Sequence, residues 1–123
     1  MQSQSEWAGL KAQAAARTLR MEPGAAEACA AACQVAHDAL GDDMAMTRQC
    51  ARVAGLGSWQ SGQAIAQKFK DKAGVDNPVE NSAAGVIALH RRVLAEMRDT
   101  FRAAGQAYAA AEQGHEDQLR GLS

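Results

Sequence analysis

The chain has few of the residues that build β-sheets. Val, Ile and Thr together number 11 of 123 residues, too few β-branched side chains to furnish a sheet. Leu, Ile, Val and Phe together number 18, and aromatic residues make up 4% of the chain. Such a low content is typical of disordered proteins when the net charge is high, but here the formal net charge is −1. The sequence therefore favours a folded protein without strands.

An excess of charge of one sign is also absent. The chain contains 13 basic and 14 acidic residues, so it has no excess of positive charge that would bind nucleic acid. No run approaches the ~18 apolar residues of a membrane span. Residues 1–6 contain neither a basic nor an apolar region, so we expect no Sec-type signal peptide. Three cysteines are few for a disulfide framework, and we expect reduced thiols in a cytoplasm.

Alanine is what the chain has in abundance. Its 29 alanines make up half of the hydrophobic residues. Because Ala is the best helix former, we predict an all-α fold. An alanine core buries little apolar area and stabilises a fold weakly, which favours association with a partner or with a second copy.

Glycine and proline divide the chain into four helical segments. A short amphipathic helix is expected over residues 5–20, before the break Glu22-Pro23-Gly24. Apolar and small residues then recur at three- and four-residue steps from Ala25 to about Ala54, with Pro23 in the first turn and a possible kink at Gly41.

A glycine-containing corner follows, and the return arm is broken. Ser58 or Ser61 is available to cap a shorter helix over residues 63–73. After the break at residues 74–78 the last helix is predicted over about 78–118, with Asn77 as its N-cap and Pro78 at its first position.

The last helix carries a heptad pattern that predicts a packing seam. Its apolar positions alternate in steps of four and three residues: Ala83, Ile87, His90, Leu94, Met97, Phe101, Ala104, Tyr108 and Ala111. We expect its large members Ile87, Leu94, Met97 and Phe101 to meet a partner.

These segments predict an antiparallel helical hairpin with two long helices, a Gly/Trp corner and a broken second arm. The expected organisation is an N-terminal helical arm over 1–22, a hairpin domain over 23–118 and a flexible tail over 119–123. Two such hairpins would pair into a four-helix bundle.

Two groups of residues stand out on this hairpin. Trp59 lies at the corner, where its ring either covers the open end of an alanine-lined hairpin or is offered to a partner. Tyr108 and Glu112 are four residues apart near the end of the last helix and share one face. On spacing alone, Tyr108 is the last large residue of the seam and Glu112 is a surface charge.

Together these features resemble the WXG (ESX-type) proteins of type VII secretion. The resemblance covers about residues 25–112 and rests on a Trp and a Gly in the turn, followed by Tyr-x-x-x-Asp/Glu in the tail of the second helix. The turn Trp59-Gln60-Ser61-Gly62 is one residue longer than the family's Trp-x-Gly. Residues 70–82 also depart from the family pattern, as does the N-terminal arm.

The resemblance implies a non-enzymatic protein that is exported by a type VII secretion system or escorts an effector to it. The partners implied are a second copy or a small helical protein, a secreted effector or toxin, and the secretion ATPase. Trp59, Gly62, Tyr108 and Glu112 would form the export signal. The protein would be cytoplasmic before export and then secreted or displayed on the cell surface.

Two alternatives stay open. Cys29, Cys33 and His37 are spaced by four residues and share one helix face, which could hold Cu(I) or Zn in a cytosolic helical bundle. The same cysteines also suit an alanine-like seam as small apolar residues, and we expect no metal and no cofactor. The chain could equally be a plain helical adaptor. No phosphate-binding loop or catalytic constellation is present, so we predict no enzymatic activity.

Overall fold

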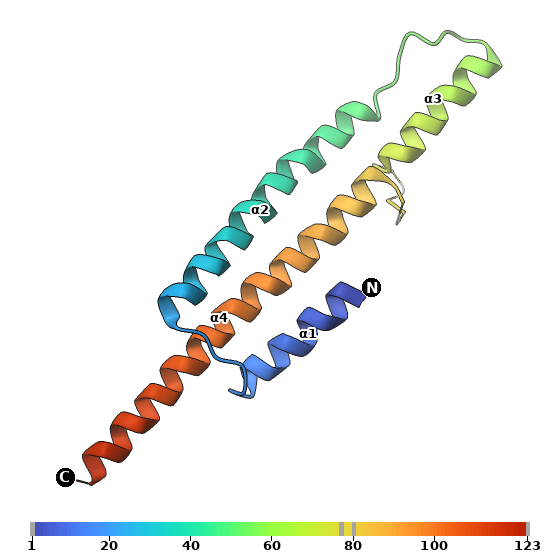
Figure 1. The fold of residues 1–123 in the computed structure, drawn as a ribbon. Helices are drawn as coiled ribbons and strands as arrows, with labels where there is room; N and C mark the ends of the chain where they lie inside the picture. Colours follow the sequence, from blue (N-terminus) through green and yellow to red (C-terminus); the bar gives the residue numbers. More distant parts are fainter. Residues whose placement is uncertain (1, 77, 80, 123) are drawn as a thin grey trace. The chain divides into compact units, whose positions relative to one another are not determined.

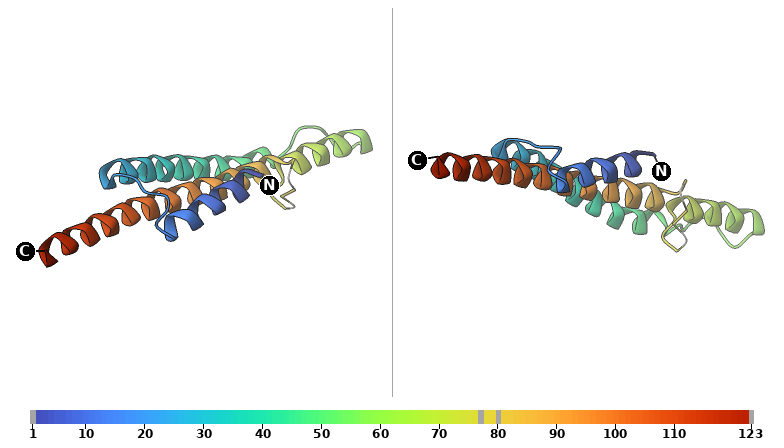
Figure 2. Two further views of the ribbon diagram at one scale, coloured as in Figure 1. Left: turned by 60° about the horizontal axis from the view of Figure 1, so that its bottom comes forward. Right: turned by 90° about the horizontal axis from the view of Figure 1, so that it is seen from below.

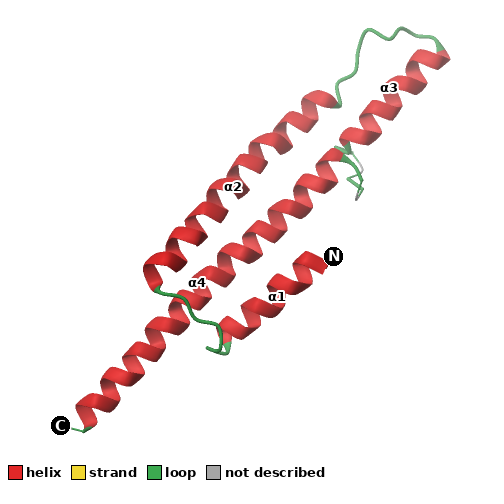
Figure 3. Cartoon of the chain, viewed as in Figure 1, coloured by secondary structure: helices red, strands yellow, loops and turns green. Residues whose placement is uncertain are grey.

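The computed structural model describes residues 2–76, 78–79 and 81–122, and every regular element in these ranges is an α-helix (Figure 1). The helices are α1 (Gln2–Ala15), α2 (Pro23–Cys50), α3 (Gln60–Ala73) and α4 (Ala83–Gly121). Figure 3 shows the loop between α2 and α3 and the break that separates α3 from α4. The predicted all-α hairpin, with two long helices and a broken return arm, is confirmed.

The chain forms two compact units that divide both long helices. One unit contains Met1–Ala36 and Arg92–Ser123, and therefore α1, the start of α2 and most of α4. The other contains His37–Arg91, and therefore the end of α2, α3 and the start of α4. We name them the terminal unit and the corner unit.

The first two helices end earlier than predicted. α1 ends at Ala15 rather than near Arg20, because Arg17 adopts the left-handed conformation with φ 67°. The N–H groups of Thr18 and Leu19 then donate to the carbonyl of Gln13 and close the helix. α2 ends at Cys50 rather than near Ala54, and it continues through residue 41 without interruption.

The predicted start of the last helix at Pro78 is wrong, since α4 begins at Ala83. Ser82 precedes it and acts as the N-cap: its hydroxyl accepts a hydrogen bond from the Gly85 N–H at 3.1 Å and donates to the Val79 carbonyl at 2.8 Å. Asn77, the predicted cap, lies outside the described residues. At its other end α4 continues to Gly121, into the segment expected to be a tail.

Glu22 caps the start of α2. Its two carboxylate oxygens accept hydrogen bonds from the N–H groups of Gly24 and Ala25, at 2.9 and 2.8 Å. Pro23, as predicted, occupies the first helical position, where its missing N–H has no cost. A carboxylate here also complements the positive end of the helix dipole.

The interior of the terminal unit consists of small side chains. Gly105 of α4 is buried, and a Cβ atom placed on it would lie 2.8 Å from the Cβ of Ala26 on α2. Since real Cβ atoms do not approach this closely, position 105 requires a glycine opposite the methyl group of Ala26. The buried apolar residues of this unit are all small: Ala14, Ala26, Ala30, Cys33, Ala104 and Ala107.

Helix α1 packs beside α4 in the terminal unit and runs in the same direction (Figures 1 and 2). The rings of Trp7 and Phe101 form an edge-to-face pair with centroids 5.7 Å apart. The ammonium of Lys11 lies 3.8 Å from a carboxylate oxygen of Glu96 and 3.9 Å from one of Asp99. The seam residue Phe101 is therefore partnered within its own chain.

The heptad seam of α4 differs from the predicted one. Ala83 and His90 are exposed, whereas Ala84, Thr100 and Ala107 are buried. Thr100 is only 2% exposed, and its burial is tolerated because its hydroxyl donates to the Glu96 carbonyl at 2.7 Å, with the Trp7 carbonyl as a second acceptor at 3.5 Å. Trp7 of α1 thus contacts this part of α4 through its carbonyl and through its ring against Phe101, so packing of α1 contributes to the inward face of α4 here.

The two glycines of α4 allow a matched test of the small-residue contact. Gly105→Ala forces two Cβ atoms together, and we expect overpacking of about 1–3 kcal/mol to exceed the ~1 kcal/mol gain in helix propensity. Gly114→Ala on the same helix meets nothing within 4 Å and should gain up to ~1 kcal/mol. Chemical denaturation of both variants measures the difference. A stabilising Gly105→Ala would contradict the close approach of the two helices.

The cap at Glu22 predicts a pH-dependent contribution to stability. Hydrogen bonds from the Gly24 and Ala25 N–H groups lower the pKa of its carboxyl group. Its contribution is therefore complete above the carboxyl's unfolded-state pKa and is lost as pH falls through the lower folded-state pKa. We expect Glu22→Ala to lower the Tm at pH 7 and to have little effect near pH 2. A difference in Tm that persists at the acidic pH would refute the cap.

Candidate functional site

The corner between α2 and α3 is built by glycines. Gly55 and Gly57 have φ of 87° and 81°, in the left-handed region that glycine adopts without steric cost. Gly62, in the first turn of α3, faces the carbonyl oxygen of Leu56, and a Cβ on Gly62 would collide with it. Gly62 therefore allows the loop to pack against the first turn of α3. This structural role is independent of any role in partner recognition.

Trp59 occupies the N-cap position of α3 in extended conformation, with φ −67° and ψ 147°. It makes no side-chain cap hydrogen bond, so the predicted caps Ser58 and Ser61 do not take that position. The Trp59 side chain is 82% exposed. The alternative in which its ring covers the end of an alanine-lined interior is therefore wrong.

Three other large apolar residues near Trp59 in the sequence are also exposed in the corner unit. Phe69 is 59% exposed and Ile65 is 48% exposed, four residues apart on α3, and Leu56 is exposed in the preceding loop. We call these four residues, Leu56, Trp59, Ile65 and Phe69, the corner surface. Single exposed hydrophobic residues are ordinary, but several on one short helix and its loop are typical of an interaction site.

A groove lies beside the corner surface, between the end of α2, the loop after it and α3. Its volume is about 610 Å³. Apolar side chains and two cations line it, and none of the described lining residues is acidic: Gln49, Cys50, Arg52, Val53, Ala54, Phe69, Lys72, Ala73 and Ala83. We call it the corner groove.

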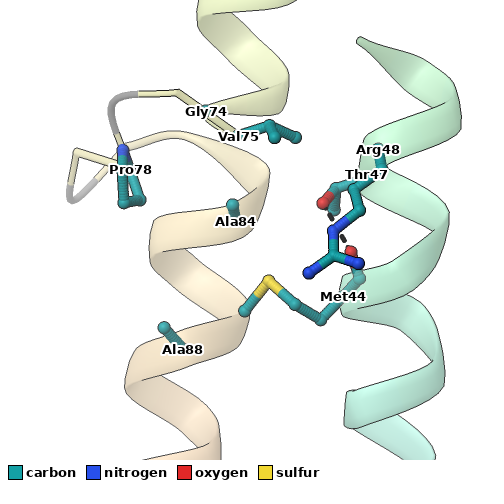
Figure 4. Close-up of a pocket in the computed structure, with 8 residues that line it drawn as sticks. All are labelled: Met44, Thr47, Arg48, Gly74, Val75, Pro78, Ala84 and Ala88. Carbon is teal, nitrogen blue, oxygen red and sulfur yellow. Dashed lines mark hydrogen bonds between the residues drawn. The ribbon is translucent and has the colours of Figure 1, made fainter.

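A smaller hollow in the same unit, of about 190 Å³, separates α2 from the start of α4. Figure 4 shows Met44 reaching from α2 toward Ala84 and Ala88, with Thr47 beside it. The Thr47 hydroxyl donates to the Met44 carbonyl at 2.6 Å, which satisfies its only donor. The hollow forms because small alanines lie opposite one flexible Met side chain. It is therefore a packing defect rather than a polar binding site.

Tyr108 and Glu112 lie in the terminal unit, whereas Trp59 and Gly62 lie in the corner unit. Tyr108 is half-buried, and Glu112 is exposed. The Nδ1 atom of His115 lies 3.9 Å from a carboxylate oxygen of Glu112. An exposed pair at this distance contributes little to stability, so Glu112 is available to a partner.

Three of the large residues of the predicted partner seam, Leu94, Met97 and Phe101, lie in the terminal unit, and Ile87 lies in the corner unit. All four are half-buried. Each therefore keeps part of its apolar surface exposed.

The three cysteines have different environments. Cys33 is buried, Cys29 is half-buried and Cys50 is exposed, and all three are free thiols. Burial raises the pKa of the Cys33 thiol, the nearby Cys29 raises it further, and the Arg98 guanidinium lowers it in part. A raised pKa keeps Cys33 a neutral thiol at pH 7, which makes it a poor nucleophile.

The helix-borne trio Cys29, Cys33 and His37 does not form a metal-ligand cluster. Within the described residues, no group of three His, Cys, Asp or Glu side chains is arranged to hold an ion. The His37 ring instead lies 3.2 Å from a carboxylate oxygen of Asp38.

Some features of the structure were not predicted from the sequence. The Glu22 cap, the ion pairs of Lys11 and the corner groove each depend on side chains meeting in three dimensions. Only the cap had a local signal, since an acidic residue directly before Pro-Gly is well placed for a helix N-terminus.

Comparisons with known proteins give no relative for this chain. No protein-family model, no curated protein and no solved structure matches it. Among the described helices, none is long and apolar enough to cross a membrane.

The exposure of Trp59 predicts that its removal is nearly neutral for folding. In dilute protein we expect Trp59→Ala to change the free energy of unfolding by no more than ~0.5 kcal/mol. Phe101→Ala should cost at least ~1 kcal/mol, because it also removes the edge-to-face pair with Trp7. Denaturant unfolding of both variants checks this. A large loss for Trp59→Ala would mean that its ring is packed against the chain.

Proposed function

We propose that this chain is a non-enzymatic helical hairpin whose function is to pair with another protein through its corner surface. The observation that carries the proposal is the 82% exposure of Trp59 at the start of α3, the helix that also bears the exposed Ile65 and Phe69. Large aromatic and aliphatic side chains at a glycine-shaped corner are the type of residue that dominates protein interfaces.

The composition of the interior supports the same proposal. The buried apolar residues in the described part of the chain are seven alanines and Cys33. Burial of methyl groups contributes little, at ~25 cal/mol per Å² of apolar area. The larger apolar side chains keep part of their surface exposed, and covering that surface with a partner would add the stabilisation that the alanine interior lacks.

The resemblance to the WXG proteins gives the pairing a biological setting. We propose that the protein is a substrate of a type VII secretion system, or an escort that takes an effector to it, and that it leaves the cytoplasm by this route. Trp59 and Gly62 at the corner, with Tyr108 and Glu112 on α4, would be the residues that the secretion machinery recognises. The exposure of Trp59 and Glu112 is compatible with that role.

The test of the export proposal is Glu112→Ala in the native host. Glu112 is exposed, so its removal should change stability by less than ~0.5 kcal/mol. We expect the variant to accumulate in the cytosol and to be lost from the culture supernatant, with unchanged helical content by circular dichroism.

Glu116→Ala is the matched control, because Glu116 is also exposed on α4, one turn later, where it pairs with Arg120 at 3.1 Å. It should leave export unchanged. If Glu112→Ala is exported normally, this residue is not part of a signal. If the wild-type protein is never exported, the type VII setting is wrong and pairing alone remains, as in a helical adaptor.

A further inference from the structure

The corner groove combines an apolar floor with a cationic rim. Val53, Ala54 and Phe69 contribute apolar surface, while Arg52 and Lys72 line the groove from the loop and from α3. Lys68 and Lys70 flank Phe69 on α3, and both are exposed. The acidic residue of this helix, Asp71, accepts a hydrogen bond from Gln67 at 2.9 Å.

We infer that the corner groove binds an acidic amphipathic helix of a partner protein, with apolar side chains against Phe69 and carboxylates against Arg52 and Lys72. The groove is open and has an apolar lining from α2, the loop and α3, and an amphipathic helix binds to such a surface through its apolar face. Because the described lining is cationic without acidic residues, an occupant with carboxylates beside its apolar face is complementary to it. This inference rests on the proposed pairing function and specifies the partner's chemistry.

The charge of the whole corner unit favours a protein helix over a lipid surface. Residues 37–91 contain six basic and six acidic residues, so the unit has no net positive charge to attract an extended anionic membrane surface. The two cations of the groove lining, Arg52 and Lys72, instead offer a local contact to the carboxylates of one helix.

The probe for the test is a fluorescein-labelled helical peptide with Leu along one face and Glu on its flanks, titrated with the full chain by fluorescence anisotropy. The reference peptide carries Lys in place of each Glu. We expect the Glu peptide to bind the wild-type chain at low salt and to weaken about tenfold or more when salt rises from about 0.05 M to about 0.5 M. The Lys peptide should not bind.

Two lysines of α3 supply a matched pair of variants. Lys72→Glu and Lys70→Glu change the net charge equally, are two residues apart and are both exposed, but only Lys72 lines the groove. We expect Lys72→Glu to weaken the Glu peptide about tenfold, because an attractive rim contact becomes repulsive. Lys70→Glu should bind within about twofold of the wild type. Equal losses in the two variants would mean nonspecific charge attraction and would overturn the inference.

Alkylation of Cys50 gives an independent readout, because this exposed thiol lines the groove. In a Cys29→Ala, Cys33→Ala background, the Glu peptide should slow maleimide labelling of Cys50. Slower labelling with rising concentration of the chain alone would assign the groove to a second copy and overturn the inference.

Three further results would also overturn the inference: equal binding of both peptides, binding of neither, and binding of phosphatidylglycerol vesicles in place of the Glu peptide. Export measured with Glu112→Ala does not involve this groove, because Glu112 lies on α4 in the terminal unit. If export depends on Glu112 while the peptide fails to bind, only the inference falls.

Discussion

The close approach of α2 and α4 in the terminal unit is the constraint on which the rest of the structure depends. Ala26 and Gly105 meet so closely that a methyl group on the glycine could not be accommodated. Two helices at this separation exclude large side chains from the line between them. The buried apolar set is accordingly alanine with one cysteine, and Trp7 and Phe101 pair at its edge.

The corner unit likewise has an interior of small side chains. Its buried residues in the described ranges are also small, among them Ala73, Ser82 and Ala84. Trp59, Ile65 and Phe69 are therefore placed where a partner can cover them, and Arg52 and Lys72 add charge beside Phe69. The alanine-rich composition thus leaves methyl groups inside and several large apolar side chains outside. This arrangement suits a protein that functions by pairing with another protein.

The fold was predictable because alanine content, helix periodicity and Gly/Pro breaks are local signals. A break was predicted at residues 74–78, and the start of α4 was misplaced by five residues, from Pro78 to Ala83. By sequence alone the last helix could begin at Pro78, since proline suits a first helical turn. The start after Ser82 is set by the hydrogen bonds of the Ser82 hydroxyl with Gly85 and Val79, which the sequence does not reveal. The exposure of Trp59 could not be predicted, since the sequence allowed both a covered and an offered ring. The corner groove needs residues from α2, a loop and α3 together, which no local pattern contains.

The most direct test of the account is hydroxyl-radical footprinting of the dilute chain, read residue by residue by mass spectrometry. Residues of one type share intrinsic reactivity, so three pairs compare burial alone: Trp59 with Trp7, Phe69 with Phe101, and Met46 with Met44. In each pair the first is exposed and the second is half-buried. The account predicts faster oxidation of the first residue in every pair. Equal rates, or protection of Trp59 and Phe69 in the isolated chain, would contradict an interior of small side chains with its large apolar residues outside.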